Sequence, residues 1–166
     1  MRVLFCFIVL LFVGELNAQS AIVHWAYGPF GTMGDAAYIL ENDRIYQACG
    51  PFGEKGACLF VFDETQVFRS SDAFGRKGTG VYLMEGDNFY RCTGTFCTKG
   101  PCALLMEGNK IYRGDGAFCA KNSGAFFIEG NTIFLAEGPL ASKTDAILQT
   151  KGNVPLVALL AIMAGL

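Results

Sequence analysis

Six cysteines carry the clearest chemistry in this sequence. The sequence has seven cysteines, of which Cys6 falls in the segment 1–18 that we expect to be removed; the remaining six are Cys49, Cys58, Cys92, Cys97, Cys102 and Cys119. An even number of cysteines in an exported chain predicts disulfides, because an oxidising compartment favours paired thiols. A zinc site is the alternative for the last four, but their spacing lacks the Cys-x2-Cys pair of structural zinc sites. We therefore predict disulfides and no metal site.

Three tyrosines, Tyr46, Tyr90 and Tyr112, occupy equivalent positions of a repeating pattern. If they were exposed on one face, they would form a flat platform on which sugar rings or a partner protein could stack. However, Phe68 and Phe134 stand at the same position in other repeats. Because this repeat position accepts either tyrosine or phenylalanine, the hydroxyl is not required there. The exchange indicates that these rings pack in the core and do not recognise a ligand.

Groups that could perform catalysis are sparse. His24 is the only histidine, and nothing in the spacing brings a cysteine to it as a nucleophile. Acidic residues recur once per repeat, which is typical of a solvated edge and not of paired catalytic carboxylates. They are Glu41, Asp63, Glu85, Glu107 and Glu129. The sequence predicts a non-enzymatic protein without a cofactor.

All these residues lie on a 22-residue repeat. The chain of 166 residues, the length of one domain, aligns with itself in blocks that begin at Trp25, Gln47, Arg69, Arg91, Arg113 and Leu135. Such a period marks a repeat architecture, in which each unit buries its apolar side only against its neighbours. We place this repeat domain at residues 19–156.

Each block contains two short apolar runs that are typical of β-strands. Pairs such as Asn42-Asp43 and Gly108-Asn109 between the runs tolerate the positive φ of a tight turn. No window shows a sustained helical period. The predicted fold is all-β, with six two-strand repeats stacked either as a β-solenoid or as an antiparallel hairpin meander.

The two architectures predict different contacts. A meander places Cys49 opposite Cys58, and Cys92 near Cys102, because each pair flanks one loop. A solenoid stacks like positions about 4.8 Å apart, which brings Cys97 to Cys119. It would also align one aromatic row into a ladder: Phe30, Phe52, Phe74, Phe96 and Phe118.

Both chain ends differ from the repeats. Residues 1–18 have a basic residue, an apolar run and a Leu-Asn-Ala end, which predicts a secretory signal peptide. The apolar tail, residues 157–166, is too short to span a membrane. We predict that it forms a final strand or an oligomer contact, and a lipid-anchor signal is the alternative.

These features together predict a secreted, periplasmic or cell-surface protein with a structural or self-assembling role. Self-association would use the open repeat ends and the apolar tail. The alternative is a module that binds a glycan or a surface protein through Tyr46, Tyr90 and Tyr112. The net charge of −2 gives no sign of nucleic-acid binding.

Overall fold

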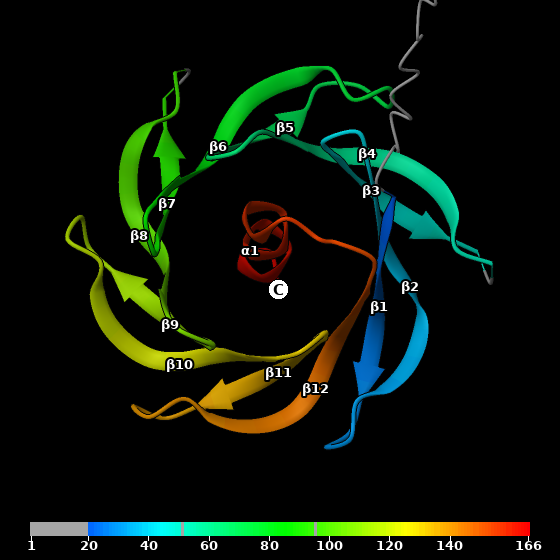
Figure 1. Ribbon diagram of the computed structural model, residues 1–166. Coiled ribbons are helices and arrows are strands. Elements are labelled where there is room, and N and C mark those ends of the chain that lie inside the picture. The colour runs from blue at the N-terminus through cyan, green and yellow to red at the C-terminus, as the bar shows by residue number, and fades with distance from the viewer. Residues whose placement is uncertain (1–19, 51, 95) are drawn as a thin grey trace, which may run out of the picture.

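The computed structural model describes residues 20–166 except 51 and 95, and these residues form a closed antiparallel barrel of twelve strands around one helix (Figure 1). The strands are β1 (Ala21–Tyr27), β2 (Thr32–Glu41), β3 (Arg44–Cys49), β4 (Glu54–Phe62), β5 (Gln66–Ser70), β6 (Lys77–Glu85), β7 (Asn88–Thr93), β8 (Thr98–Glu107), β9 (Lys110–Asp115), β10 (Ala120–Glu129), β11 (Thr132–Glu137) and β12 (Ser142–Lys151). The predicted signal peptide, residues 1–18, lies outside the described residues.

Every strand pairs with its neighbours in sequence, and β1 pairs with β12 to close the barrel. The predicted antiparallel meander is therefore confirmed, and the solenoid alternative is wrong. Short turns explain this outcome, because a two-residue turn joins antiparallel strands while a parallel connection needs a longer crossover. Asn42 and Asp43 both adopt positive φ, as such a turn requires.

The alternation of turns gives the barrel two different ends. The tight turns lie at one end, and four-residue loops such as 28–31, between β1 and β2, lie at the other. Register shifts occur in each strand pair that such a loop joins, for example between His24 and Ala26. Such bulges bend the sheet. The loops consequently lean outward from the barrel wall (Figure 1).

The C-terminal tail forms α1 (Leu156–Ala164), which lies in the barrel lumen (Figure 1). The predicted final strand is therefore wrong. All nine helical residues are apolar, and seven of them are buried. A helix that is apolar all round has no polar face to create a helical period, and such a helix must be enclosed. Sequence periodicity consequently gives no signal for this helix.

Six inward side chains, spaced 22 residues apart, pack around this helix. These residues are Val23, Ile45, Val67, Phe89, Ile111 and Ile133, all at most 1% exposed. They belong to the same cluster as the helix residues Leu160 and Ile162. The chain thus fills its own barrel, and the repeats share a core that no single repeat could build.

Barrel charges near the helix ends match its dipole. Asp43, Asp63 and Glu64 line a cavity with the N-terminal helix residue Leu156. Arginines from β7 and β9, Arg91 and Arg113, line another cavity at the opposite end of the helix. Acidic groups near a helix N-terminus and basic groups near its C-terminus stabilise the helix. Acidic groups of the barrel thus lie toward the start of α1 and basic groups toward its end.

Candidate functional site

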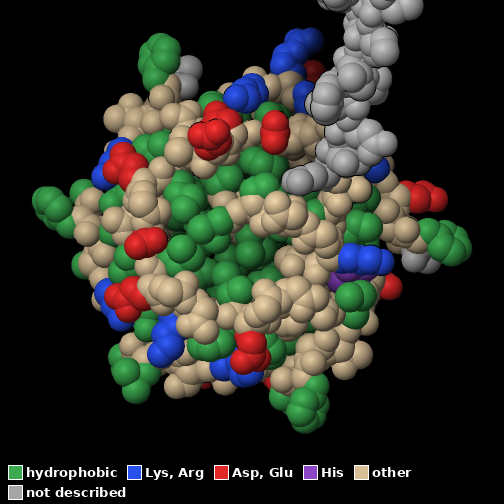
Figure 2. Space-filling model, viewed as in Figure 1, with side chains coloured by type: hydrophobic (Ala, Val, Ile, Leu, Met, Phe, Trp, Pro, Cys, Tyr) green, Lys and Arg blue, Asp and Glu red, His purple; other side chains and the backbone are tan. Residues whose placement is uncertain are grey.

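Six apolar side chains project from the loops at one end of the barrel, one from each repeat in the described residues. We call them the tip ring: Phe30, Phe52, Phe74, Phe96, Phe118 and Leu140. The five phenylalanines are 89–97% exposed, and Leu140 is 72% exposed. Hydrophobic side chains stand on projections around the outline of the molecule (Figure 2). Among the described residues, no other large apolar side chain is as exposed as these six, so the tip ring is the candidate contact surface.

The loops hold these side chains in a defined backbone conformation. Gly31 donates its N–H to the carbonyl of Gly28, and Gly53 donates to Gly50 in the next repeat. The residue after each tip has positive φ, and it is glycine in the first three repeats. Glycine adopts this conformation without a steric cost. Contact through such a preformed loop loses less conformational entropy than contact through a mobile one.

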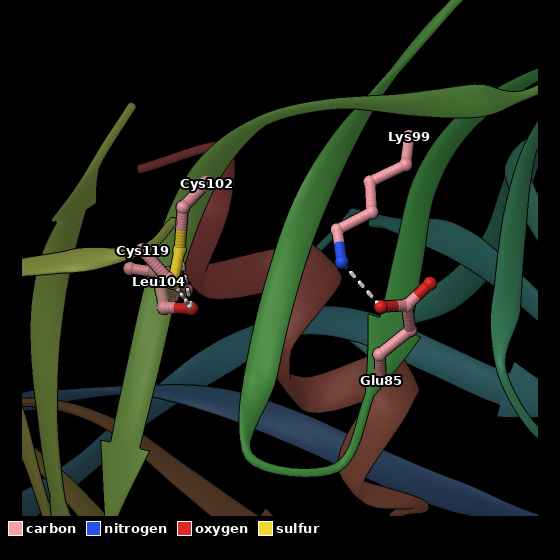
Figure 3. Close-up of a disulfide and its surroundings, with 5 residues drawn as sticks. All are labelled: Glu85, Lys99, Cys102, Leu104 and Cys119. Atoms are coloured by element: carbon pink, nitrogen blue, oxygen red, sulfur yellow. Dashed lines mark hydrogen bonds and ion pairs between the residues drawn. A yellow bond between two sulfur atoms is a disulfide. The ribbon is translucent and has the colours of Figure 1, made fainter. Parts of the chain in front are cut away.

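Disulfides flank two of the tips. Cys92 and Cys97 bracket the loop that carries Phe96, and their Cα atoms are 4.5 Å apart. Cys119 follows Phe118 directly and is bonded to Cys102, with Cα atoms 4.9 Å apart. Both sulfurs of this second bridge lie within 3.8 Å of the Leu104 carbonyl oxygen (Figure 3).

This connectivity differs from each pairing that the sequence suggested. Cys97 and Cys119 bond to other cysteines, and Cys92 does not bond to Cys102. Cys49 and Cys58 are free, the former exposed and the latter buried. In the pairing of β7 with β8, Cys92 lies opposite Lys99 and Cys102 lies opposite Tyr90, so Cys92 and Cys102 do not face each other. Bonds of this kind are typical of proteins that mature in an oxidising environment outside the cytosol.

The predicted tyrosine platform is not present as an open surface. Tyr90 and Tyr112 are 3% and 2% exposed, and Tyr46 is half-buried. A lysine lies over each ring, with its Nζ 4.1 Å from the Tyr90 centroid and 3.9 Å from the Tyr112 centroid. Cation–π contact of this kind covers the aromatic face. These tyrosines therefore belong to the packing of the barrel wall.

The same lysines explain the recurring acidic residues. Lys99 pairs with Glu85 at 2.5 Å (Figure 3), and equivalent pairs join Lys55 to Glu41 and Lys121 to Glu107. Hydrogen bonding to the carboxylate raises the lysine pKa in all three pairs. Two further pairs complete the series, Lys77–Asp63 and Lys143–Glu129. The acidic row is thus neutralised on the outer wall and forms no carboxylate pair.

The sixth copy of this arrangement is altered where β1 meets β12. His24 takes the tyrosine position, Met33 the lysine position and Lys151 the glutamate position. His24 contacts the carbonyl oxygen of Gly34 through Nδ1 at 3.2 Å. His24 precedes the first repeat in the sequence, and β1 places it in the barrel wall between β2 and β12.

Two cavities of similar size lie at the ends of the helix. One, of about 620 Å³, is lined by Tyr82, Arg91, Cys92 and Ala164 among others. The other, of about 600 Å³, is the acidic one beside Pro155 and Leu156. Neither gathers a nucleophile with a general base, and the described residues contain no cluster suited to hold a metal ion.

Comparison with known protein families, with curated proteins and with solved structures found no match to this chain. In the part of the chain that the structure describes, no helix has the length and apolar character needed to cross a membrane. The candidate function therefore depends on the geometry of the site alone.

The tip ring is visible in the sequence only as a row of like residues. The motif Gly-Pro-Phe-Gly at 28–31 and 50–53 places a phenylalanine between turn-forming residues. Such a residue cannot reach the core from the tip of a short loop. The solenoid alternative would have aligned this row into a ladder, whereas the closed barrel leaves its members exposed.

Proposed function

We propose that this chain is an exported, non-enzymatic β-repeat protein with a structural role, and that the tip ring is its contact surface. The observation that carries this proposal is the near-complete exposure of one large apolar side chain per repeat, at one end of a barrel whose other large side chains mostly pack. Burial of such side chains against a partner removes apolar surface from water, and that removal drives association.

The rest of the molecule supports a structural role. The lumen is filled by α1, and the outer wall is covered by paired charges. The disulfides support export, since they form and persist in oxidising compartments. The glycan-binding alternative lacks comparable support, because Tyr90 and Tyr112 are covered by lysines.

Retention on a phenyl-substituted resin tests the contact surface. In one variant, serine replaces all six tip residues. Its matched control is Y27S/M33S/L135S, which removes other apolar side chains that are 41–59% exposed. We expect the tip variant to elute well before the wild type, and the control to elute close to it. Equal retention of the wild type and the tip variant would contradict the proposal.

Export is tested separately by expression of the full chain in a secretory host. We expect the protein in the medium, with residues 1–18 removed according to its intact mass. Recovery only inside the cell, with the leader uncleaved, would refute that part of the proposal.

A further inference from the structure

We infer that the partner of the tip ring is a second copy of this chain, and that copies associate side by side, tip to tip, into a sheet-like assembly. This inference rests on the proposed function, because it names the partner of the same surface. It uses only the tip ring: Phe30, Phe52, Phe74, Phe96, Phe118 and Leu140.

The arrangement of the tips sets the geometry. Six repeats close into one barrel, so the six loops point in six directions around its axis (Figure 1). Five tips carry the same residue, phenylalanine. A contact between two equivalent tips is isologous, because the same residue of each copy contacts its counterpart in the other copy. Repeated around the axis, such contacts extend in a plane and do not close after two copies.

The area that two facing tips can bury is small, so an assembly through the tips needs several contacts per copy. An aromatic side chain buries roughly 150–250 Å², so two facing tips bury on the order of 400 Å² in total. Specific complexes need about 1,200 Å². One tip contact therefore cannot hold a dimer, whereas several contacts per copy act together through multivalency. Assembly should consequently begin above a threshold concentration.

The charges around the tips permit this approach. The net charge of the chain is only −2, so long-range repulsion between copies is weak. A lysine follows four of the five phenylalanine loops and is paired with an acidic residue, as in Lys99–Glu85 and Lys121–Glu107, whereas Met33 follows the loop of Phe30. Neighbouring copies therefore meet with little repulsion, and no excess of positive charge favours an anionic lipid surface.

The routes to self-association that the sequence suggested are closed. The pairing of β1 with β12 leaves no open sheet edge among the described strands. The apolar tail is enclosed as α1, with Leu160 and Ile162 each 2% exposed. Among the exposed large apolar residues, the tip ring offers the most accessible side chains. Association through the tips needs neither unfolding of the barrel nor release of the helix.

Two triple variants test the geometry with the same apolar residues removed. F52S/F96S/L140S retains Phe30, Phe74 and Phe118, which alternate around the barrel. F30S/F52S/L140S retains Phe74, Phe96 and Phe118, which are adjacent. Each variant loses two phenylalanines and one leucine. Both are full-length, and circular dichroism together with disulfide mapping verifies that each remains folded.

Light scattering and negative-stain electron microscopy across a concentration series give the readout. We expect planar assemblies for the wild type, branched planar assemblies for the alternating variant, and only short ribbons or small oligomers for the adjacent variant. The six-serine variant should remain monomeric. A wild type that stays monomeric at millimolar concentration, or equal behaviour of the two triple variants, would overturn the inference.

A vesicle arm separates this inference from the broader proposal. Co-sedimentation uses phosphatidylcholine vesicles with and without phosphatidylserine. Tip-dependent vesicle binding by a strictly monomeric protein would overturn self-association while leaving the tip ring as a contact surface. Loss of tip dependence in both vesicle binding and phenyl-resin retention would remove the proposed function itself.

Discussion

A third disulfide can be introduced two repeats before an existing one, at the equivalent pair of positions. Cys102 and Cys119 are bonded, and the residues 44 positions before them are Cys58 and Gly75. A Cβ placed on Gly75 would lie 3.2 Å from the Cys58 sulfur. We therefore predict that Gly75→Cys forms a bond to the free, buried Cys58.

The expected magnitude follows from the loop and the backbone. The new bond closes the same sequence separation as Cys102–Cys119, 17 residues, which corresponds to about 3 kcal/mol in the chain-entropy account. Gly75 has a φ of +82°, and Cys97 and Cys119 adopt positive φ at the same repeat position. A side chain there costs roughly 1–2 kcal/mol, and Arg44 must shift away from Gly75. We expect a net gain of about 1–2 kcal/mol.

Urea unfolding of the oxidised protein measures this gain. Gly75→Ser is the matched control, because it introduces the same backbone strain without a sulfur. The free energy of unfolding should be highest for the Gly75→Cys variant, intermediate for the wild type and lowest for the Gly75→Ser variant. The titration is repeated with a reductant that is too weak to reduce Cys92–Cys97 and Cys102–Cys119. Under this condition only the new bond to Cys58 opens, and the gain in the free energy of unfolding should disappear.

Among residues 20–166, mass spectrometry of the oxidised Gly75→Cys variant should find one free thiol, that of Cys49, where the wild type has two. Three free thiols, or a cysteine variant no more stable than the serine variant, would refute the reasoning.

Three further predictions concern the core, the wall and a turn. Leu160→Ala removes a 2% exposed side chain from α1 and should lower the free energy of unfolding by about 2–5 kcal/mol, whereas Leu166→Ala, at a 52% exposed position, should change it little in the same urea titration. Tyr90→Phe should lower the free energy of unfolding by no more than the roughly 0.5–1.5 kcal/mol that one hydrogen bond contributes, because Phe68 and Phe134 already occupy the equivalent position; a larger loss in thermal unfolding would contradict this. The pKa of Asp63 is lowered although desolvation acts to raise it, because Thr65 and Gln66 donate backbone N–H groups to its carboxylate. Its stabilising effect is present above about pH 4 and is lost as pH falls through the lowered value, so the amide resonances of Thr65 and Gln66 should titrate below about pH 4 in the wild type and not in Asp63→Asn.

Much of the fold could be predicted because its signals are local. The 22-residue period, the alternating strand runs and the turn pairs such as Gly108-Asn109 are written in consecutive residues. Turn chemistry depends on the φ of one or two residues, and it selects antiparallel pairing. The all-β class and the equivalence of the repeats therefore needed no tertiary information.

The candidate site could not be predicted in this way, because exposure is a property of the assembled barrel. Phe52 and Phe89 are both phenylalanines of a repeat, yet the first is 89% exposed and the second is fully buried. The cysteine pairing is also a property of the assembled barrel, because Cys102 on β8 is bonded to Cys119 in the loop between β9 and β10. The tail is equally dependent on context: Leu156–Ala164 is apolar on every side and becomes a helix because the barrel encloses it.

The sequence by itself determined the unit: two short strands, a tight turn and a loop with a phenylalanine at its tip. Only the tertiary structure decided how many such units close into a ring, that the chain's own end fills the space inside, and that the loop tips remain in solvent. The physical reason is that hydrogen-bond geometry and turn conformation act over a few residues. Burial, in contrast, depends on what the rest of the chain brings alongside.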